Sequence, residues 1–172
     1  VASNPRTFLR HAGGEQWTSG LFVEDDWTLG RLVLTGGARV DRWTIRNGFY
    51  RQVNATTGAA TGESYADRSG WETTGRIGAL FRPGDAVALR AAAYSGFRLP
   101  TLNELYRPFV VFPITTRANA ALNPEKLKGV EAGVDLTPMK GVTLSATAFY
   151  NRLDGAIAKR ARIFVDDIRQ CR

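Results

Sequence analysis

The residues that could perform acid–base or nucleophilic chemistry are few and scattered. His11 and Cys171 are the only histidine and cysteine among the 172 residues, which is too few for a conventional His/Cys metal site. A Ser-His-Asp triad would have to use His11, which lies in a polar, Gly-containing start (1–16) that we interpret as a loop, with the tail of a strand as the alternative. The adjacent carboxylates 25–26 and 166–167 would point to opposite faces of a strand. We therefore expect no catalytic residue, no metal site, no cofactor and no enzymatic activity.

The polar residues with the clearest binding potential lie in and after one stretch, 94–108. The candidate ligand-binding residues are Arg98, Asn103, Glu104, Tyr106, Arg107 and Arg117. Arg107 and Arg117 would attract an anionic ligand. Arg98 and Glu104 could instead hold the loop together through a charge pair or a helix cap, and both interpretations remain open.

This stretch begins as a strand and should stop being one at Pro100, because proline removes a backbone donor and biases Leu99 toward an extended conformation. Thr101 and Glu104 then have the T-x-x-E spacing of a helix capping box. The sequence therefore predicts a single helical or 3₁₀ turn directly after the strand.

Composition excludes several classes of protein. The net charge is +7, but the arginines stand singly among apolar residues along the whole chain, which favours solvated or lumen-facing charge over a nucleic-acid patch. The single cysteine rules out an internal disulfide. No apolar run approaches the ~20 residues of a transmembrane helix.

Alternation of apolar and polar residues predicts six antiparallel strands. They cover residues 17–29, 31–45, 71–82, 86–97, 128–138 and 142–152. Short turns at Gly30, 83–85 and 138–141 alternate with long connections at 46–70, which could contain a short hairpin, and at 98–126. Tight turns at one end and long loops at the other are typical of an outer-membrane β-barrel. A soluble antiparallel sandwich would alternate in the same way.

Four phrases resemble the β-barrel of TonB-dependent outer-membrane receptors. The strongest is Ser95-Gly96-Phe97-Arg98-Leu99-Pro100-Thr101-Leu102-Asn103-Glu104-Leu105-Tyr106, and the others lie at 20–27, 37–41 and 119–125. The similarity covers residues 20–157 and leaves 158–172 unassigned. It implies an all-β fold: an antiparallel up-and-down meander that forms part of a transmembrane β-barrel, present here as an open, curved sheet.

The resemblance also implies a function and a location. In such receptors, a barrel of about 22 strands is filled by a plug domain, and an inner-membrane TonB complex drives uptake through the plug. We expect the whole chain, 1–172, to be part of such a barrel, without the plug and unable to transport alone, even with a seventh strand at 156–165. It would lie in the outer membrane of a Gram-negative bacterium. The ligand would be a small molecule such as a ferric siderophore or cobalamin; a passive porin-like channel and a soluble β-sandwich binding module are the alternatives.

The alternation assigns sides to the strands. Apolar residues that include Leu34, Ile77 and Val130 should face lipid, while Arg39, Arg76, Glu131, Asp135 and Thr147 should face the lumen. The long connections should lie outside the cell and the tight turns in the periplasm.

Overall fold

The computed structural model describes residues 8–111, 114–116 and 118–157, and nearly all of them lie in strands. The elements are β1 (Phe8–Leu29), β2 (Leu32–Asn54), β3 (Ala60–Tyr65), β4 (Arg68–Gly84), β5 (Val87–Arg98), α1 (Leu102–Tyr106), β6 (Phe109–Val111), β7 (Ile114–Thr116), β8 (Glu125–Met139) and β9 (Val142–Asp154). No helix in this described part of the chain is long and apolar enough to cross a membrane.

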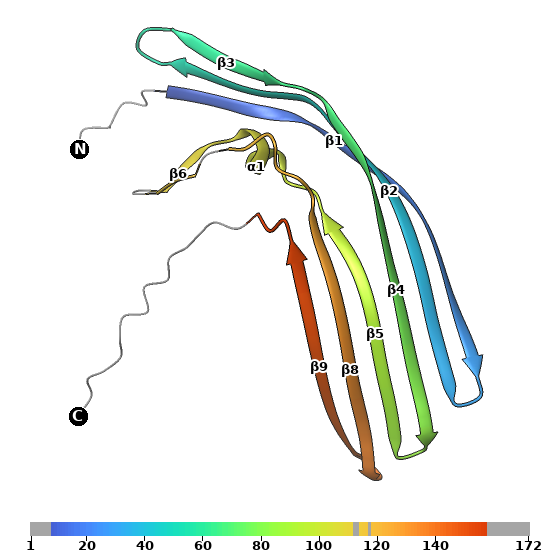
Figure 1. The fold of residues 1–172 in the computed structure, drawn as a ribbon. Coiled ribbons are helices and arrows are strands. Elements are labelled where there is room, and N and C mark those ends of the chain that lie inside the picture. Colours follow the sequence, from blue (N-terminus) through green and yellow to red (C-terminus); the bar gives the residue numbers. More distant parts are fainter. Residues whose placement is uncertain (1–7, 112–113, 117, 158–172) are drawn as a thin grey trace, which may run out of the picture.

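The main sheet is an up-and-down meander of antiparallel strands in the order β1-β2-β4-β5-β8-β9, with β3 paired to the upper part of β2. The sheet is strongly curved and open, and the connections that carry α1 fold into its hollow side (Figure 1). The predicted fold class is therefore confirmed. The possible seventh strand at 156–165 lies almost entirely outside the described residues.

The strands extend farther than the sequence predicted. Residues 8–16 were interpreted as a loop, with the tail of a strand as the alternative. The structure shows the alternative, because they pair with the upper part of β2 from Phe8↔Asn54 to Glu15↔Arg46. Much of the predicted loop 46–70 is also strand, since β2 continues to Asn54 and β3 returns alongside it as the hairpin that the sequence allowed. On one face of these segments, His11 and Arg51 interrupt the apolar residues Leu9, Phe49 and Val53. The segments therefore lack the regular apolar alternation by which a half-buried strand is recognised.

Two prolines sit where the ladder needs no donor. The sequence placed Pro83 and Pro138 in turns, but both lie at the ends of strands and the turns follow them. Each proline lies within a register shift of its strand pair: Phe81/Gly84 in β4 and Leu136/Met139 in β8. A register shift beside a turn tolerates the missing N–H of proline. The tight turns therefore fall at 85–86 and 140–141.

The register divides the sheet into two faces. Rows such as Trp27↔Leu34↔Ala79↔Ala91↔Ala132 put apolar side chains on the convex face. These side chains are bare: Leu21 is 78% exposed, Ile77 66% and Leu144 58%. Exposed apolar area of this extent needs an apolar surrounding, which the hydrocarbon of a bilayer provides.

The concave face carries the polar partners of the same rows. Arg39, Arg76, Glu131, Asp135 and Thr147 alternate with the apolar residues and fall on this face, as predicted. The one buried apolar cluster among the described residues also lies on this side. It joins Trp43 and Ile45 of β2 to Leu105 and Tyr106 of α1.

Candidate binding surface at the rim of the sheet

The helix α1 forms where its capping box predicts. Glu104 N donates to Thr101 Oγ1 at 3.3 Å, and Thr101 N donates to Glu104 Oε2 at 2.7 Å. The strand before it ends at Arg98, two residues ahead of Pro100. Both local predictions about this stretch are thus confirmed.

Arg98 joins three separate segments of the rim. Its Nε donates to Glu125 Oε2 at 2.6 Å, at the start of β8, and its two Nη atoms lie 3.2 and 3.3 Å from the oxygens of Glu104 on α1. Arg98 and Glu104 therefore hold the loop together, which is one of the two roles that the sequence left open. Partial burial raises the pKa of Glu104, but the hydrogen bonds from Arg98 and Thr101 outweigh it and keep that pKa below the usual range.

The Tyr106 ring packs between the backbone at Gly48 and a second tyrosine. The ring stacks on Tyr65 of β3, with centroids 4.9 Å apart and planes 19° apart. A Cβ on Gly48 would lie 2.4 Å from Tyr106 Cζ, so only glycine leaves room for the ring there. Tyr106 is 1% exposed. This candidate binding residue therefore packs the helix against the sheet and does not line an open surface.

Arg68 is a residue of the rim that sequence reasoning missed. From the start of β4 its Nη1 donates to the carbonyls of Ala120 at 2.6 Å and Leu122 at 2.9 Å, and its Nη2 donates to Asn123 Oδ1 at 3.2 Å. These contacts hold the segment that enters β8. The partners lie more than fifty residues away in the chain, and no local pattern around Arg68 indicates them.

The remaining candidates stand at the surface or beyond the description. Asn103 and Arg107 are both exposed at the rim, where a soluble ligand could reach them. Arg107 N also donates to Asn103 O at 3.0 Å, which closes the helix. Arg117 lies outside the described residues.

Below the rim, the concave wall is lined with paired charges. Arg39 pairs with the buried Asp41 at 2.6 Å, and Arg76 pairs with Glu24. Arg90 donates to Thr147 Oγ1 at 2.8 Å and lies 3.3 Å from Asp135. Charged and polar pairs within and between strands make this wall polar and wettable.

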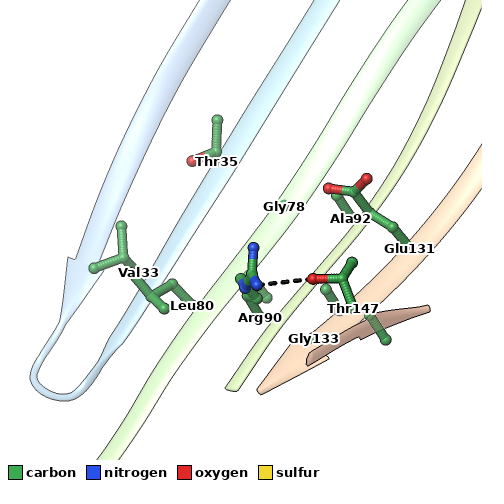
Figure 2. Close-up of a pocket in the computed structure, with 12 residues that line it drawn as sticks. Val33, Thr35, Gly78, Leu80, Arg90, Ala92, Glu131, Gly133 and Thr147 are labelled. Carbon is green, nitrogen blue, oxygen red and sulfur yellow. Dashed lines mark hydrogen bonds between the residues drawn. The ribbon is translucent and has the colours of Figure 1, made fainter. Parts of the chain in front are cut away.

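Small side chains leave a shallow hollow in this wall. Its volume is about 240 Å³, and Figure 2 shows Arg90, Glu131 and Thr147 around it, with Gly78 and Thr35 on the neighbouring strands. The hollow presents one guanidinium and one carboxylate, which is a surface for polar contacts. Among the described residues, no three His, Cys, Asp or Glu side chains gather as metal ligands would.

Comparison with known proteins gives a family and a fold. The family model described as TonB dependent receptor-like, beta-barrel matches residues 2–167. No curated protein matches the chain.

Solved structures share the architecture at low sequence identity. A double mutant of the Serratia marcescens hemophore receptor HasR, in complex with its hemophore HasA and heme, is 20% identical with a TM-score of 0.65. The copper transporter OprC is 20% identical with a TM-score of 0.61, and the FrpB iron transporter from Neisseria meningitidis (F3-3 variant) is 16% identical with a TM-score of 0.51. The matches cover 82%, 80% and 80% of this chain but only 26%, 21% and 18% of those chains.

Proposed function

The chain belongs to the TonB-dependent receptor β-barrel family of the bacterial outer membrane, and from this we propose that it forms part of the barrel wall of a receptor for energy-coupled uptake. The observation that carries the proposal is the family match over residues 2–167. In the proposed receptor, the convex face meets lipid and the concave face lines a wet interior.

The two faces of the sheet support this role. The convex face exposes apolar side chains, as a lipid-facing wall must. The concave face carries salt bridges, among them Arg39–Asp41 within β2 and Arg90–Asp135 between β5 and β8. An interior of this polarity suits a water-filled or plugged lumen, and the proposed partner that fills it is a plug domain through which the TonB complex acts.

We further propose that the ligand is a scarce small molecule such as a metal chelate, with ferric siderophores and cobalamin as the first candidates. The similar structures are named as a heme–hemophore receptor, a copper transporter and an iron transporter. In this chain, the exposed Arg107 at the rim and the net charge of +7 favour an anionic chelate. Arg117, in the same connection, is proposed to act alongside it.

Uptake by intact cells tests the proposal. A strain that lacks the full-length receptor would be complemented with the wild-type gene and given radiolabelled ferric siderophore or cobalamin, with the energising complex present or deleted. We expect saturable uptake that requires both the receptor and the energising complex. Uptake that rises linearly with concentration and survives loss of that complex would indicate a passive pore instead.

Substitution at the rim tests the ligand class. Arg107→Gln in the full-length receptor should slow association of an anionic chelate, and the difference should fade as salt rises, because a rim charge acts mainly on the encounter rate. Lys140→Gln, in the tight turn at the opposite end of the sheet, is the matched control and should bind as the wild type does. Equal rates in all three proteins would remove Arg107 from the binding surface.

A further inference from the structure

Charged residues on the convex face gather at one end of the sheet. Beyond the apolar rows, toward the long connections, outward positions carry Arg42 and Arg46 on β2, Lys128 on β8 and Arg152 on β9. Two acidic residues, Glu15 and Asp154, share this zone. These six residues carry a surplus of two positive charges. Arg51, farther along β2, and Lys126, which pairs with Glu72 at 2.8 Å, are not included in this sum.

Arg42 is the best-defined cation of this zone. Its guanidinium carbon lies 5.3 Å from the ring centroid of Trp71, its register partner on β4, and its Nη2 donates to Ser69 Oγ at 3.2 Å. No carboxylate pairs with Arg42 in the part of the chain that the structure describes. The indole fixes the cation in place and leaves its charge unneutralised.

The surroundings of Arg42 belong to a membrane interface. Trp71 is 63% exposed. Trp17 lies on the neighbouring β1, two residues before the register partner of Arg42, and is 74% exposed on the same convex face. The next outward row contains Leu21 and Val40, where the apolar band begins. Tryptophan collects at the level of lipid headgroups because its ring is apolar and its N–H is polar.

The other end of the sheet lacks such a zone. Its outward positions hold apolar residues, among them Leu29, Leu32 and Leu136, and one carboxylate, Asp25, which lies in the row of Gly36 and Ile77. Arg31 stands in the turn there and donates to the carbonyl of Pro83. Among the strand residues that the structure describes, the outward-facing cations therefore lie near the long connections.

We propose that Arg42, whose guanidinium lies over the Trp71 ring, binds the phosphate of a phosphorylated lipid headgroup in the outer leaflet, with Arg46 on the same face four residues farther along β2. A guanidinium held over an indole offers several N–H donors to phosphate oxygens, and a second arginine on the same face adds positive charge. The occupant is a lipid because the donors stand directly above a band of apolar side chains that acyl chains would cover. This inference rests on the outer-membrane location of the barrel and not on the identity of the transported ligand.

Lipid binding to the full-length receptor in detergent tests the site. The probes are diphosphoryl lipid A and monophosphoryl lipid A, and the readout is the fraction of lipid-bound receptor in native mass spectrometry. Wild-type receptor should prefer the diphosphoryl form. Arg42→Gln should weaken its binding roughly fivefold, the effect of one arginine near an anionic headgroup, and Arg42→Lys should keep most of it.

Controls separate this site from general charge and from free phosphate. Lys140→Gln, at the opposite end, should bind lipid A as the wild type does, and added inorganic phosphate at constant ionic strength should displace nothing. Equal binding by Arg42→Gln and wild type, an equal loss in Lys140→Gln, or displacement by phosphate would each overturn the proposal. If Arg42→Gln does not fold, Trp71→Leu replaces it, and an unchanged preference in that variant would also overturn it.

Discussion

Gly48 shows how a single missing side chain positions the rim helix. The residue lies next to Asn47, whose φ of 52° is left-handed, and the Tyr106 ring occupies the space where a Cβ would stand. From this point the even-numbered residues of β2 face the concave side, whereas Arg42 and Thr44 below it face outward. A local irregularity thus turns the upper strand toward the helix.

Gly48→Ala should therefore displace the Tyr106 ring from its packing against β2. Overpacking of this kind costs about 1–3 kcal/mol, and it should appear as faster hydrogen exchange of the α1 amides in the full-length receptor. Gly96→Ala is the matched control, because no heavy atom lies within 4 Å of the Cβ it would add. Equal exchange in the two variants would show that the packing of Tyr106 against Gly48 tolerates an added methyl group.

Glu104 makes the attachment of α1 sensitive to acid. Its pKa in the folded chain lies below the usual value because the hydrogen bonds of Arg98 and Thr101 outweigh the effect of burial. A lowered pKa means that the contact contributes fully above the unfolded-state pKa of about 4.3 and is lost as the pH falls through the folded-state pKa.

A spin label at the exposed Asn103 should thus keep its mobility from neutral pH down to the ordinary glutamate range and become more mobile only below it. In Arg98→Gln, the pKa of Glu104 loses its main lowering partner, so the transition should move to higher pH. A mobility profile that is identical with and without Arg98 would contradict this account.

At the scale of elements, the register decides which residues meet lipid. Ala92 and Ala93 are neighbours on β5 with opposite faces: Ala92 pairs with Glu131 on the concave side, and Ala93 lies between Ile77 and Val130 on the convex side. They are the same residue type one position apart, so a single substitution can report the two environments.

Arginine at these two positions should behave very differently. Ala93→Arg places a charge in the middle of the apolar band, at a cost of about 2–4 kcal/mol, while Ala92→Arg faces the Glu131 carboxylate in a polar wall and should cost little. The free energy of unfolding of the full-length receptor in lipid vesicles measures both. A similar loss in the two variants would mean that the assignment of faces is wrong.

The whole molecule separates two kinds of connection. The tight turns at 30–31, 85–86 and 140–141 lie at one end of the curved sheet, and the β2–β3 hairpin and the α1 connection lie at the other (Figure 1). Antiparallel order makes this separation obligatory, since each strand returns to the end from which its neighbour started.

An epitope tag at 56–58, in the β2–β3 hairpin, should accordingly be detected by antibody on intact cells. A tag at 140–141 should be detected only after the outer membrane is permeabilised. Both tags belong in the full-length receptor, with surface expression confirmed by the first. Surface detection of the 140–141 tag on intact cells would reverse the orientation.

The sequence by itself determined the features that depend on neighbouring residues in the chain. Alternation predicted the membrane-level parts of six strands and their sides, and Thr101 with Glu104 predicted the helix, because side-chain direction and capping follow from local spacing. The family phrases around Ser95–Tyr106 indicated the barrel, and the family match bears this out.

Tertiary structure alone decided what depends on segments far apart in the chain. Residues 8–16 and 46–54 are strands because each supplies the other with hydrogen-bond partners, although neither has a continuous apolar face. Arg68 reaches the segment before β8, and Tyr106 is buried because Gly48 and Tyr65 meet it there. Backbone pairing and close packing arise only when the sheet assembles, and no periodicity within one segment records them.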